Sequence, residues 1–243
     1  MLYVENIGIM NKTAVISGAT KGIGLAIAHA FAKIGFDLAI CARNQDDLNQ
    51  LAVAFAKDYP KSRVVVYSAD LSKVEKVKAF AQFIKESFTK IDVLVNNTGV
   101  FITGDILSEP DGTLESQIET NLYSAYYLTR ELVGNIPKYG HIFNMASIAS
   151  FMAYPGGGSY TISKFAMLGF SKVLREELKG QYIKVTSIMP GATWSNSWQG
   201  DNLPPYERLM PAKDIAAMII ACWQLGPSSV VEDLVIRPQL GDL

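Results

Sequence analysis

The sequence predicts an α/β fold, a doubly wound parallel sheet of about seven strands, Rossmann-like, with helices on both faces. Short apolar runs alternate with longer stretches in which apolar residues recur at helical spacing. The short runs are apolar throughout, which is typical of parallel strands covered on both faces. The chain has 243 residues, of which 49% are hydrophobic, enough for one sizeable core. Because no repeat or linker divides it, we interpret residues 1–243 as a single domain, with 1–10 as an N-terminal extension.

The elements follow one another in a regular order. After the first apolar run, Ile27, Phe31 and Ile34 share one face of a helix. Asn44 is a candidate N-cap of the second helix, with Asp47 as its capping-box partner. Strands are expected at residues 13–18, 37–42, 63–68, 91–97, 141–147, 183–191 and 232–238, and helices at 23–35, 45–57, 72–88, 113–133, 158–179 and 213–225.

The composition excludes several classes of protein. Lys and Arg total 22 against 23 Asp and Glu, so the chain has no basic footprint for nucleic acid. No apolar run approaches the roughly 20 residues of a membrane span, and the first ten residues do not resemble a signal peptide. Cys41 and Cys222 show no metal-like spacing. We therefore expect a reduced, cytoplasmic protein with no metal site and no nucleic-acid or membrane partner.

A glycine-rich segment, SGATKGIG, follows the first predicted strand and opens a helix. Its glycines, Gly18, Gly22 and Gly24, permit a tight turn and let the backbone approach a pyrophosphate at the helix N-terminus. A glycine triplet can also serve a turn alone, but the strand–turn–helix context favours nucleotide binding. The domain is therefore predicted to bind a dinucleotide.

Charged residues near the second strand indicate which dinucleotide. An acid at the tip of that strand usually holds an adenosine 2′-hydroxyl, and a base holds a 2′-phosphate. No carboxylate stands at the tip, whereas Arg43 follows it and Lys21 lies in the glycine loop. Asp46 and Asp47 are interpreted as acids favoured in the first turn of a helix. Two cations and no acid favour NADP(H) over NAD(H), although each cation alone could be a solvated surface residue.

Tyr160 and Lys164 lie four residues apart and share one helix face. A free tyrosine has a pKa of about 10, so acid–base work at neutral pH requires a pKa lower by roughly 2–3 units. A neighbouring ammonium favours the phenolate, and the positive ring of an oxidised nicotinamide would favour it further. The alternative is a lysine extending past a half-buried tyrosine. Ser147 follows the fifth strand, where its hydroxyl can hydrogen-bond a substrate carbonyl, or serve only as a turn residue.

Together these motifs resemble the short-chain dehydrogenase/reductase family, in its compact single-domain branch of 3-oxoacyl-carrier-protein reductases and carbonyl reductases. The similarity extends from Lys12 to about Pro238, and the order and spacing of the motifs make it specific. The motifs are SGATKGIG at 17–24, Asp70, NNTG at 96–99, Asn121, Ser147, Tyr160-x-x-x-Lys164 and Pro190-Gly191.

The resemblance implies a role for each of the catalytic candidates. Tyr160 would be the general acid/base, and Lys164 would lower its pKa and hydrogen-bond the nicotinamide ribose. Ser147 would orient and polarise the carbonyl, and Asn121 would hold a water in a proton relay. The resemblance further places Asp70 at the adenine, the Asn97 region along the cofactor and Thr193 at the carboxamide. The implied cofactor-binding residues are Gly18, Thr20, Lys21, Gly22, Ile23, Gly24, Arg43, Asp70, Asn97, Gly99, Tyr160, Lys164, Pro190, Gly191 and Thr193.

Aromatic and thioether side chains dominate the two segments that close the substrate pocket in this family, which suits an apolar carbonyl substrate. They are Phe151, Met152, Tyr154, Trp194, Trp198 and Tyr206. Some of them could serve only to anchor the lid. Arg208 is the candidate cation for a substrate carboxylate, and glycines 156–158 are expected to form a flexible entry to the catalytic helix. Thr98 departs from the family's usual alanine and adds a polar group close to the cofactor.

We predict an NADP(H)-dependent oxidoreductase that transfers a hydride between nicotinamide and a carbonyl or secondary alcohol. One alternative is a non-enzymatic NADP-sensing regulator on the same fold. Another is a 3-oxoacyl reductase that depends on an acyl carrier protein. Docking of this acidic carrier would need exposed cations, and the end of the catalytic helix carries both cationic and acidic residues, which neither demands nor excludes a carrier. An epimerase or dehydratase using the same pair would need a longer chain. By resemblance, a homodimer or homotetramer through two long helices is expected.

Overall fold

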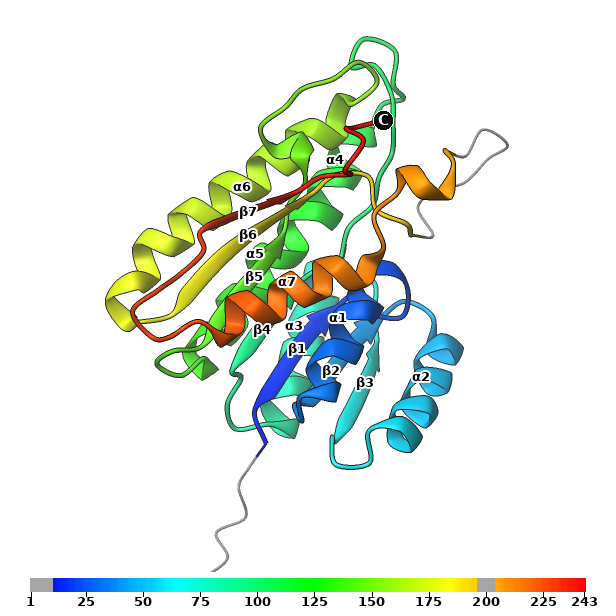
Figure 1. The fold of residues 1–243 in the computed structure, drawn as a ribbon. Coiled ribbons are helices and arrows are strands. Elements are labelled where there is room, and N and C mark those ends of the chain that lie inside the picture. The colour runs from blue at the N-terminus through cyan, green and yellow to red at the C-terminus, as the bar shows by residue number, and fades with distance from the viewer. Residues whose placement is uncertain (1–10, 196–203) are drawn as a thin grey trace, which may run out of the picture.

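The computed structural model describes residues 11–195 and 204–243 (Figure 1). The proposed extension at 1–10 therefore lies outside the described residues, as does Trp198. The strands are β1 Thr13–Ser17, β2 Asp37–Ala42, β3 Val64–Ser68, β4 Val93–Asn96, β5 His141–Met145, β6 Lys184–Pro190 and β7 Asp233–Ile236. The α-helices are α1 Gly22–Lys33, α2 Gln45–Asp58, α3 Val74–Ser87, α4 Thr113–Ile118, α5 Ser124–Leu132, α6 Gly158–Leu178 and α7 Ala212–Gln224. Each lies within three residues of its predicted position, apart from the long helix predicted at 113–133.

The seven strands form one parallel sheet in the order β3-β2-β1-β4-β5-β6-β7. This confirms the predicted doubly wound, Rossmann-like fold. The strand order reverses between β1 and β4, which are hydrogen-bonded neighbours although three helices separate them in sequence. In such sheets ligands bind beyond the carboxyl ends of the strands at this switch point. A ligand site is therefore expected at the segments that follow β1, β4 and β5.

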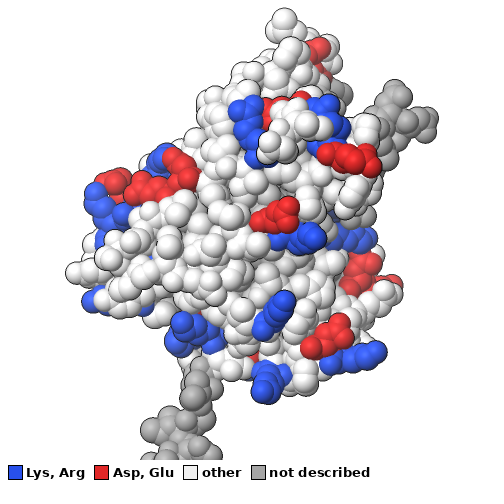
Figure 2. All heavy atoms as spheres, viewed as in Figure 1, with Lys and Arg blue, Asp and Glu red and all other residues white. Residues whose placement is uncertain are grey.

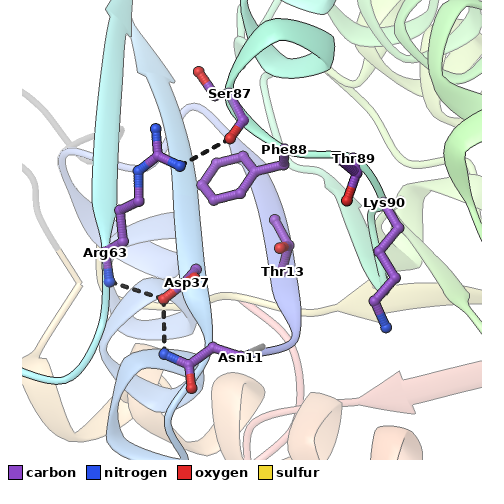
Figure 3. Close-up of a pocket in the computed structure, with 8 residues that line it drawn as sticks. All are labelled: Asn11, Thr13, Asp37, Arg63, Ser87, Phe88, Thr89 and Lys90. Atoms are coloured by element: carbon purple, nitrogen blue, oxygen red, sulfur yellow. Dashed lines mark hydrogen bonds between the residues drawn. The ribbon is translucent and has the colours of Figure 1, made fainter. Parts of the chain in front are cut away.

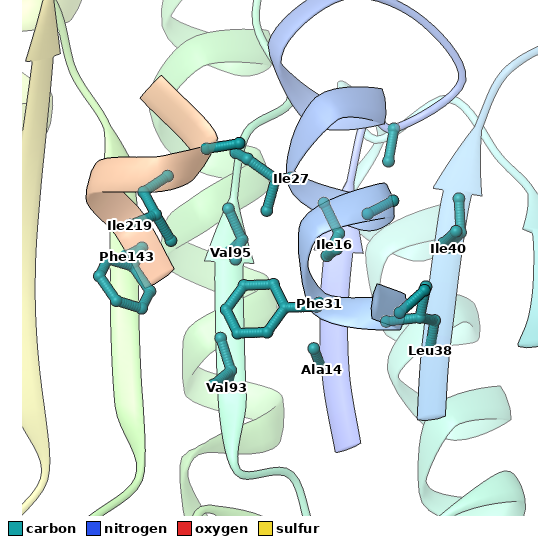
Figure 4. Close-up of a cluster of buried hydrophobic side chains, with 14 of the residues drawn as sticks. Ala14, Ile16, Ile27, Phe31, Leu38, Ile40, Val93, Val95, Phe143 and Ile219 are labelled. Carbon is teal, nitrogen blue, oxygen red and sulfur yellow. The ribbon is translucent and has the colours of Figure 1, made fainter. Parts of the chain in front are cut away.

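Each strand sends alternate side chains to the two faces of the sheet, and both faces are covered. Ile16 of β1 packs with Phe31 of α1 and Ile219 of α7 on one face (Figure 4). Val15, the preceding residue, belongs to the opposite cluster with Phe80 of α3. α1 and α7 pack against each other on the first face (Figure 1). Burying strands on both faces explains why their sequences are apolar throughout.

The long helix predicted at 113–133 changes its pitch near the middle. Between α4 and α5, residues Glu119–Tyr123 form a π-helical turn. Such single turns insert an extra residue into an α-helix and often occur at functional sites. The hydrophobic pattern did not reveal it, because a one-residue insertion hardly disturbs a period read over five turns. The prediction of one long helix is therefore confirmed, since the backbone stays helical through both junctions, but the π-helical turn that contains Asn121 was not predicted.

Two further sequence expectations concern thiols and membranes. Cys41 and Cys222 are free thiols, both buried. Among the described residues, none of the helices combines the length and the apolar character needed to cross a bilayer.

Candidate active site

The glycine loop after β1 is held against the segment after β4 by the side chain of Asn97. Its Nδ2 donates to Ser17 O at 3.0 Å and to Gly18 O at 2.8 Å. The Ser17 hydroxyl returns the contact by accepting from Asn97 N at 3.0 Å and Thr98 N at 3.0 Å. Asn97, predicted to lie along the cofactor, thus also fixes the backbone of the loop.

Two of the loop glycines are required by the backbone itself. Gly18 has φ +66°, a conformation that other residues rarely adopt. A β-carbon on Gly24 would overlap Gly18 O and Asn97 Nδ2 and would lie 2.9 Å from Ala19 Cα. The first turn of α1 therefore packs directly on the loop, as the close helix–strand packing of a dinucleotide motif requires.

The N-terminus of α1 is built to receive an anion. Its N-cap, Lys21, makes no side-chain cap hydrogen bond, and the first turn contains no acidic residue. The N-terminus of α2 is the opposite: Asn44 Oδ1 caps Asp47 N at 2.9 Å, and Asp46 and Asp47 lie in the first turn. Of these two helices, only α1 therefore has free backbone amides and no acidic side chain at the positive end of its dipole. This arrangement fits a pyrophosphate at the N-terminus of α1.

The charged candidates near the second strand are arranged differently from the prediction. Lys21 Nζ forms an ion pair of 2.8 Å with Asp47 Oδ2. The Asn44 cap was predicted correctly, but the Asp47 carboxylate pairs with Lys21, and no pattern in the sequence indicates this pair. Arg43 is exposed. Asp70, also exposed, accepts a hydrogen bond from Ser72 N at 3.1 Å, a local turn contact, and its predicted place at the adenine stays a prediction.

The candidate acid–base residues meet beyond the carboxyl end of β5. The Ser147 side chain lies close enough to the Tyr160 phenol to lower its pKa. Lys164 is 6% exposed, and its Nζ donates to Met145 O at 2.9 Å and lies 5.7 Å from the Tyr160 ring centroid. The Ser147 hydroxyl also accepts from Ala149 N at 3.1 Å, within a capping box that fixes its position. The structure thus brings together three residues predicted from separate parts of the chain.

Burial decides the ionisation of this pair. Burial raises the pKa of Tyr160 to about 12, opposed by the nearby Ser147 side chain and reinforced by Tyr154. Burial also lowers the pKa of Lys164 to about 8. The sequence predicts a lowered pKa for Tyr160, whereas burial in the protein raises it. The physical reason is that the ammonium is directed to Met145 O, while desolvation disfavours the phenolate.

Asn121 lies fully buried in the π-helical turn. Its Oδ1 accepts from Val100 N at 2.7 Å, and its Nδ2 donates to Val100 O at 3.0 Å and to Ser163 Oγ at 2.9 Å. The Ser163 hydroxyl donates to Tyr160 O at 2.7 Å. Ser163 was not among the predicted residues, although it lies one residue before Lys164. A buried serine on the catalytic helix was the signal that could have identified it.

Two of the three glycines before the catalytic helix are closely packed, whereas a β-carbon on Gly156 would meet nothing within 4 Å, and the flexibility of this entry stays a prediction. A β-carbon on Gly157 would lie 2.9 Å from Tyr154 O, and one on Gly158 would lie 2.9 Å from Glu109 Oε2. Phe101, in the segment after β4, meets the Tyr160 ring edge-on with centroids 4.7 Å apart. Phe101 and Glu109 were both missed, because only the fold brings their segment over the start of α6.

Aromatic side chains lie in the segments that follow the carboxyl ends of β5 and β6. Trp194 and Tyr206 are 43% and 58% exposed and meet edge-on with ring centroids 5.5 Å apart. The other described members of the predicted set are Phe151, Met152 and Tyr154, all more than a third exposed. The predicted set therefore presents apolar surface at this edge of the sheet.

The segment after β6 packs against the end of the chain. A β-carbon on Gly191 would lie 2.9 Å from Pro238 Cδ. Arg208 Nη2 donates to Asp242 O at 3.0 Å and to Gly241 O at 3.4 Å. Arg208 is thus engaged by backbone carbonyls, contrary to the expectation of a cation directed at a substrate carboxylate. Pro190 ends β6, and the Thr193 hydroxyl donates to Gly191 O at 2.9 Å.

A separate hollow lies at the opposite, amino edge of the sheet (Figure 3). Asp37 Oδ1 accepts from Asn11 Nδ2 at 3.0 Å and from Arg63 N at 2.8 Å. The Arg63 guanidinium donates to Ser87 O at 2.9 Å and lies over the ring of Phe88. These polar groups bind one another, so they hold the strand starts together, and the residues predicted to be functional lie at the other edge.

Comparison with known proteins agrees with this geometry. A family model described as short chain dehydrogenase matches residues 12–203. A sepiapterin reductase of Chlorobaculum tepidum is 28% identical, with 96% of this chain and 99% of that protein aligned. A 3-oxoacyl-[acyl-carrier-protein] reductase of Chlamydia muridarum is 32% identical over 80% of each chain. An alcohol dehydrogenase of Thermococcus sibiricus, solved with 5-hydroxy-NADP, has a TM-score of 0.86 at 27% identity and covers 94% of this chain and 97% of its own. The chain therefore belongs to the short-chain dehydrogenase family.

Proposed function

We propose that the protein is an NADP(H)-dependent carbonyl reductase or alcohol dehydrogenase, with binding and catalysis in one domain. The observation that carries the proposal is the convergence of Ser147, Tyr160 and the buried Lys164, whose Nζ lies 5.7 Å from the Tyr160 ring centroid. Ser147 follows β5, and Tyr160 and Lys164 lie at the start of α6, at the same edge of the sheet as the glycine loop. A carbonyl oxygen placed between the two hydroxyls could accept a hydrogen bond from both.

The loop after β1 fits a dinucleotide. The uncapped start of α1 offers backbone amides to a pyrophosphate, with Gly18, Gly22 and Gly24 along its approach. When bound, the nicotinamide supplies or takes up the hydride, and its oxidised ring carries positive charge. We prefer NADP(H) because Lys21 and Arg43 offer positive charge near the second strand, and because the alcohol dehydrogenase neighbour was solved with an NADP derivative. Lys21 would have to serve a 2′-phosphate together with, or instead of, Asp47.

Tyr160 is proposed as the general acid/base. With its pKa raised to about 12, the phenol is protonated at neutral pH, the state needed to donate a proton during reduction. Ser147 holds and polarises the carbonyl oxygen as negative charge develops on it. Oxidation requires the phenolate, and the charge of Lys164 together with that of an oxidised nicotinamide would favour it. Asn121 would hold a water through which the proton reaches solvent.

The substrate is proposed to be an apolar carbonyl compound, because exposed aromatic side chains lie in the segments that follow β5 and β6. Dependence on an acyl carrier protein is the second candidate, since the Chlamydia muridarum relative is named for it. Carrier docking requires exposed cations, and those near the end of α6 already have acidic partners: Lys172 with Asp233, Arg175 with Glu232 and Lys179 with Glu176. On the face in Figure 2, cationic and acidic side chains alternate and form no single patch. We therefore prefer a free small molecule.

We also propose that the protein assembles as a homo-oligomer and that it is not merely a regulatory sensor. Exposed Tyr126 on α5 and Phe165 on α6 support a homodimer or homotetramer formed through these helices. A sensor without activity would have no need of the acid–base pair, and Tyr160 and Lys164 are both present. A cytoplasmic location stays a prediction.

The proposal is tested by NADPH consumption with acetoacetyl-CoA, 2,3-butanedione, sepiapterin and acetophenone. We expect turnover of at least one, and loss of more than 100-fold of it in Tyr160→Phe with NADPH affinity kept. Normal turnover in Tyr160→Phe would refute the role of the phenol. Turnover with NADH and not with NADPH would refute the roles of Lys21 and Arg43.

A further inference from the structure

The catalytic helix α6 begins without a cap of its own. Its N-cap is Gly157, which has no side chain to satisfy the free amides of the first turn. Tyr160 lies in that first turn, so any fraying there would move the phenol. The acceptor for these amides must therefore come from elsewhere in the chain.

Glu109, from the segment between β4 and α4, supplies it. Its Oε2 accepts from Ser159 N at 3.4 Å, and its Oε1 accepts from the Ser159 hydroxyl. Ser159 is fully buried, so it cannot exchange this partner for water. The carboxylate also lies at the positive end of the α6 dipole, which favours a negative charge.

The backbone around this contact is shaped to admit it. Gly158 has φ +34°, and a β-carbon there would overlap Gly104 O and lie 2.9 Å from Glu109 Oε2. Gly104 N donates to Gly156 O at 2.9 Å, and Asp105 Oδ1 accepts from Gly156 N at 3.0 Å. The glycines thus permit close approach of one segment to the helix start.

The same segment reaches Tyr160 from a second direction, because Phe101 packs edge-on against its ring. Tyr160 is therefore fixed between Phe101 at the ring and the Glu109 contact at the adjoining residue, Ser159. The groups that influence ionisation of the phenol are others: Ser147, Tyr154 and the buried site itself. The Glu109 contact is not among these groups, and it acts on the position of Tyr160.

We propose that Glu109 is a positioning residue, which caps α6 through Ser159 and thereby aims the Tyr160 hydroxyl at Ser147 and the substrate carbonyl. This inference rests on the proposed function of Tyr160. Nothing in the linear pattern identifies Glu109, since 50 residues separate it from Ser159.

Four variants test it: Glu109→Ala, Glu109→Gln, Ser159→Ala, and Glu177→Ala as an exposed control at the far end of α6. Turnover of NADPH with the best carbonyl from the panel above is measured well below each melting temperature. In Glu109→Ala we expect kcat to fall about 10-fold or more, since small misplacements of a catalytic group are costly. The KM for NADPH should change less than about 2-fold. Glu109→Gln should retain kcat within about 3-fold, because an amide can accept from Ser159 N and donate to its hydroxyl.

The pH dependence of kcat separates position from charge. We expect the profile of Glu109→Gln to match that of the wild type. Normal kcat in Glu109→Ala would overturn the inference, and so would a loss in Glu109→Gln equal to that in Glu109→Ala. If Glu109→Ala does not fold, Ser159→Ala carries the test, with a fall in kcat of a few-fold expected and unchanged kcat contradicting it.

A crystal structure of Glu109→Ala gives a readout independent of turnover. Movement of the Tyr160 hydroxyl away from Ser147 supports the positioning role, even if the wild type were to reduce none of the carbonyls and the proposed function were rejected. An unchanged position of Tyr160 with the first turn of α6 unchanged overturns the positioning role and leaves the proposed function standing.

Discussion

Asn121 and Lys164 converge on Gly99 from two different helical segments. A β-carbon on Gly99 would lie 3.2 Å from Asn121 Oδ1 and 3.7 Å from Lys164 Nζ. The segment after β4 therefore passes tightly against the π-helical turn and within ordinary contact distance of the Lys164 ammonium. Lys164 is 6% exposed, and this burial accounts for its lowered pKa.

Replacing Lys164 should separate stability from activity. Burial lowers the pKa of this lysine from 10.5 to about 8, so the unfolded chain binds the proton more tightly than the folded one. Stability is therefore reduced below pH 8 by on the order of 3 kcal/mol, and it recovers as pH rises from about 8 to 10.5. Lys164→Met removes this cost and the hydrogen bond to Met145 O, which is worth about 1.5–3 kcal/mol because its donor is charged. We expect equal or greater stability at pH 7 with turnover reduced more than 100-fold, measured by urea unfolding and NADPH oxidation.

Lys213→Met is the matched control, because Lys213 is exposed on α7. It should change stability by less than about 0.5 kcal/mol and leave turnover unchanged. A Lys164→Met variant that is clearly less stable than the wild type at pH 7 would contradict the inference that the buried ammonium destabilises the folded protein.

Gly24→Ala tests the packing of the glycine loop, and Gly169→Ala in α6 is its control. Ala is the better helix former by about 1 kcal/mol, so Gly169→Ala should stabilise α6, where a β-carbon meets nothing within 4 Å. Gly24→Ala should instead destabilise by about 1–3 kcal/mol, because its β-carbon would overlap Gly18 O. It should also weaken NADP⁺ binding by more than about 10-fold, since the loop must move. Thermal melts with and without NADP⁺ measure both effects, and a Gly24→Ala variant that binds normally would be inconsistent with this packing.

The sequence was sufficient for the fold because strand and helix periods are local. Apolar runs and caps such as Asn44 predicted all seven strands and most helix bounds. The site motifs were also found, since each directly follows a strand or lies at helical spacing. Pairings between distant segments could not be predicted in this way. The Lys21–Asp47 pair and the Glu109–Ser159 contact depend on how loops cross once the sheet has formed.

The error over Tyr160 has a different cause. Spacing of four places a lysine near a tyrosine, but the pKa depends on burial and on where the ammonium points. Lys164 is directed to Met145 O, and desolvation dominates at Tyr160. The sequence contains no measure of either quantity.

His141 should make the protein sensitive to acid. It lies fully buried, with Nε2 2.7 Å from Thr186 Oγ1, and burial together with the charge of Lys184 lowers its pKa from 6.5 to about 3. The unfolded chain binds this proton first, so stability is fully present above pH 6.5 and is lost as pH falls towards 3. At pH 5 the loss is about 2 kcal/mol.

Urea unfolding at pH 7.5 and 5 measures this loss. His141→Leu should lose about 2 kcal/mol less than the wild type over this interval. The pKa of His29 is also lowered, and because both proteins retain His29 its contribution cancels in the comparison. An identical pH dependence in the two proteins would refute the assignment to His141.

Arg208 should influence substrates of every charge to the same extent. Its guanidinium donates to Asp242 O and Gly241 O, and Arg237 pairs with the Asp242 carboxylate in the same terminal segment. Arg208→Met should therefore loosen the segment after β6 from the chain terminus. We expect KM to rise about 2- to 10-fold, the range for losing 0.5–1.5 kcal/mol of hydrogen bonding, for a neutral ketone and a ketoacid alike. Removal of residues 241–243 should reproduce the effect. A rise in KM confined to the ketoacid would mean that Arg208 leaves these carbonyls and binds the substrate carboxylate directly.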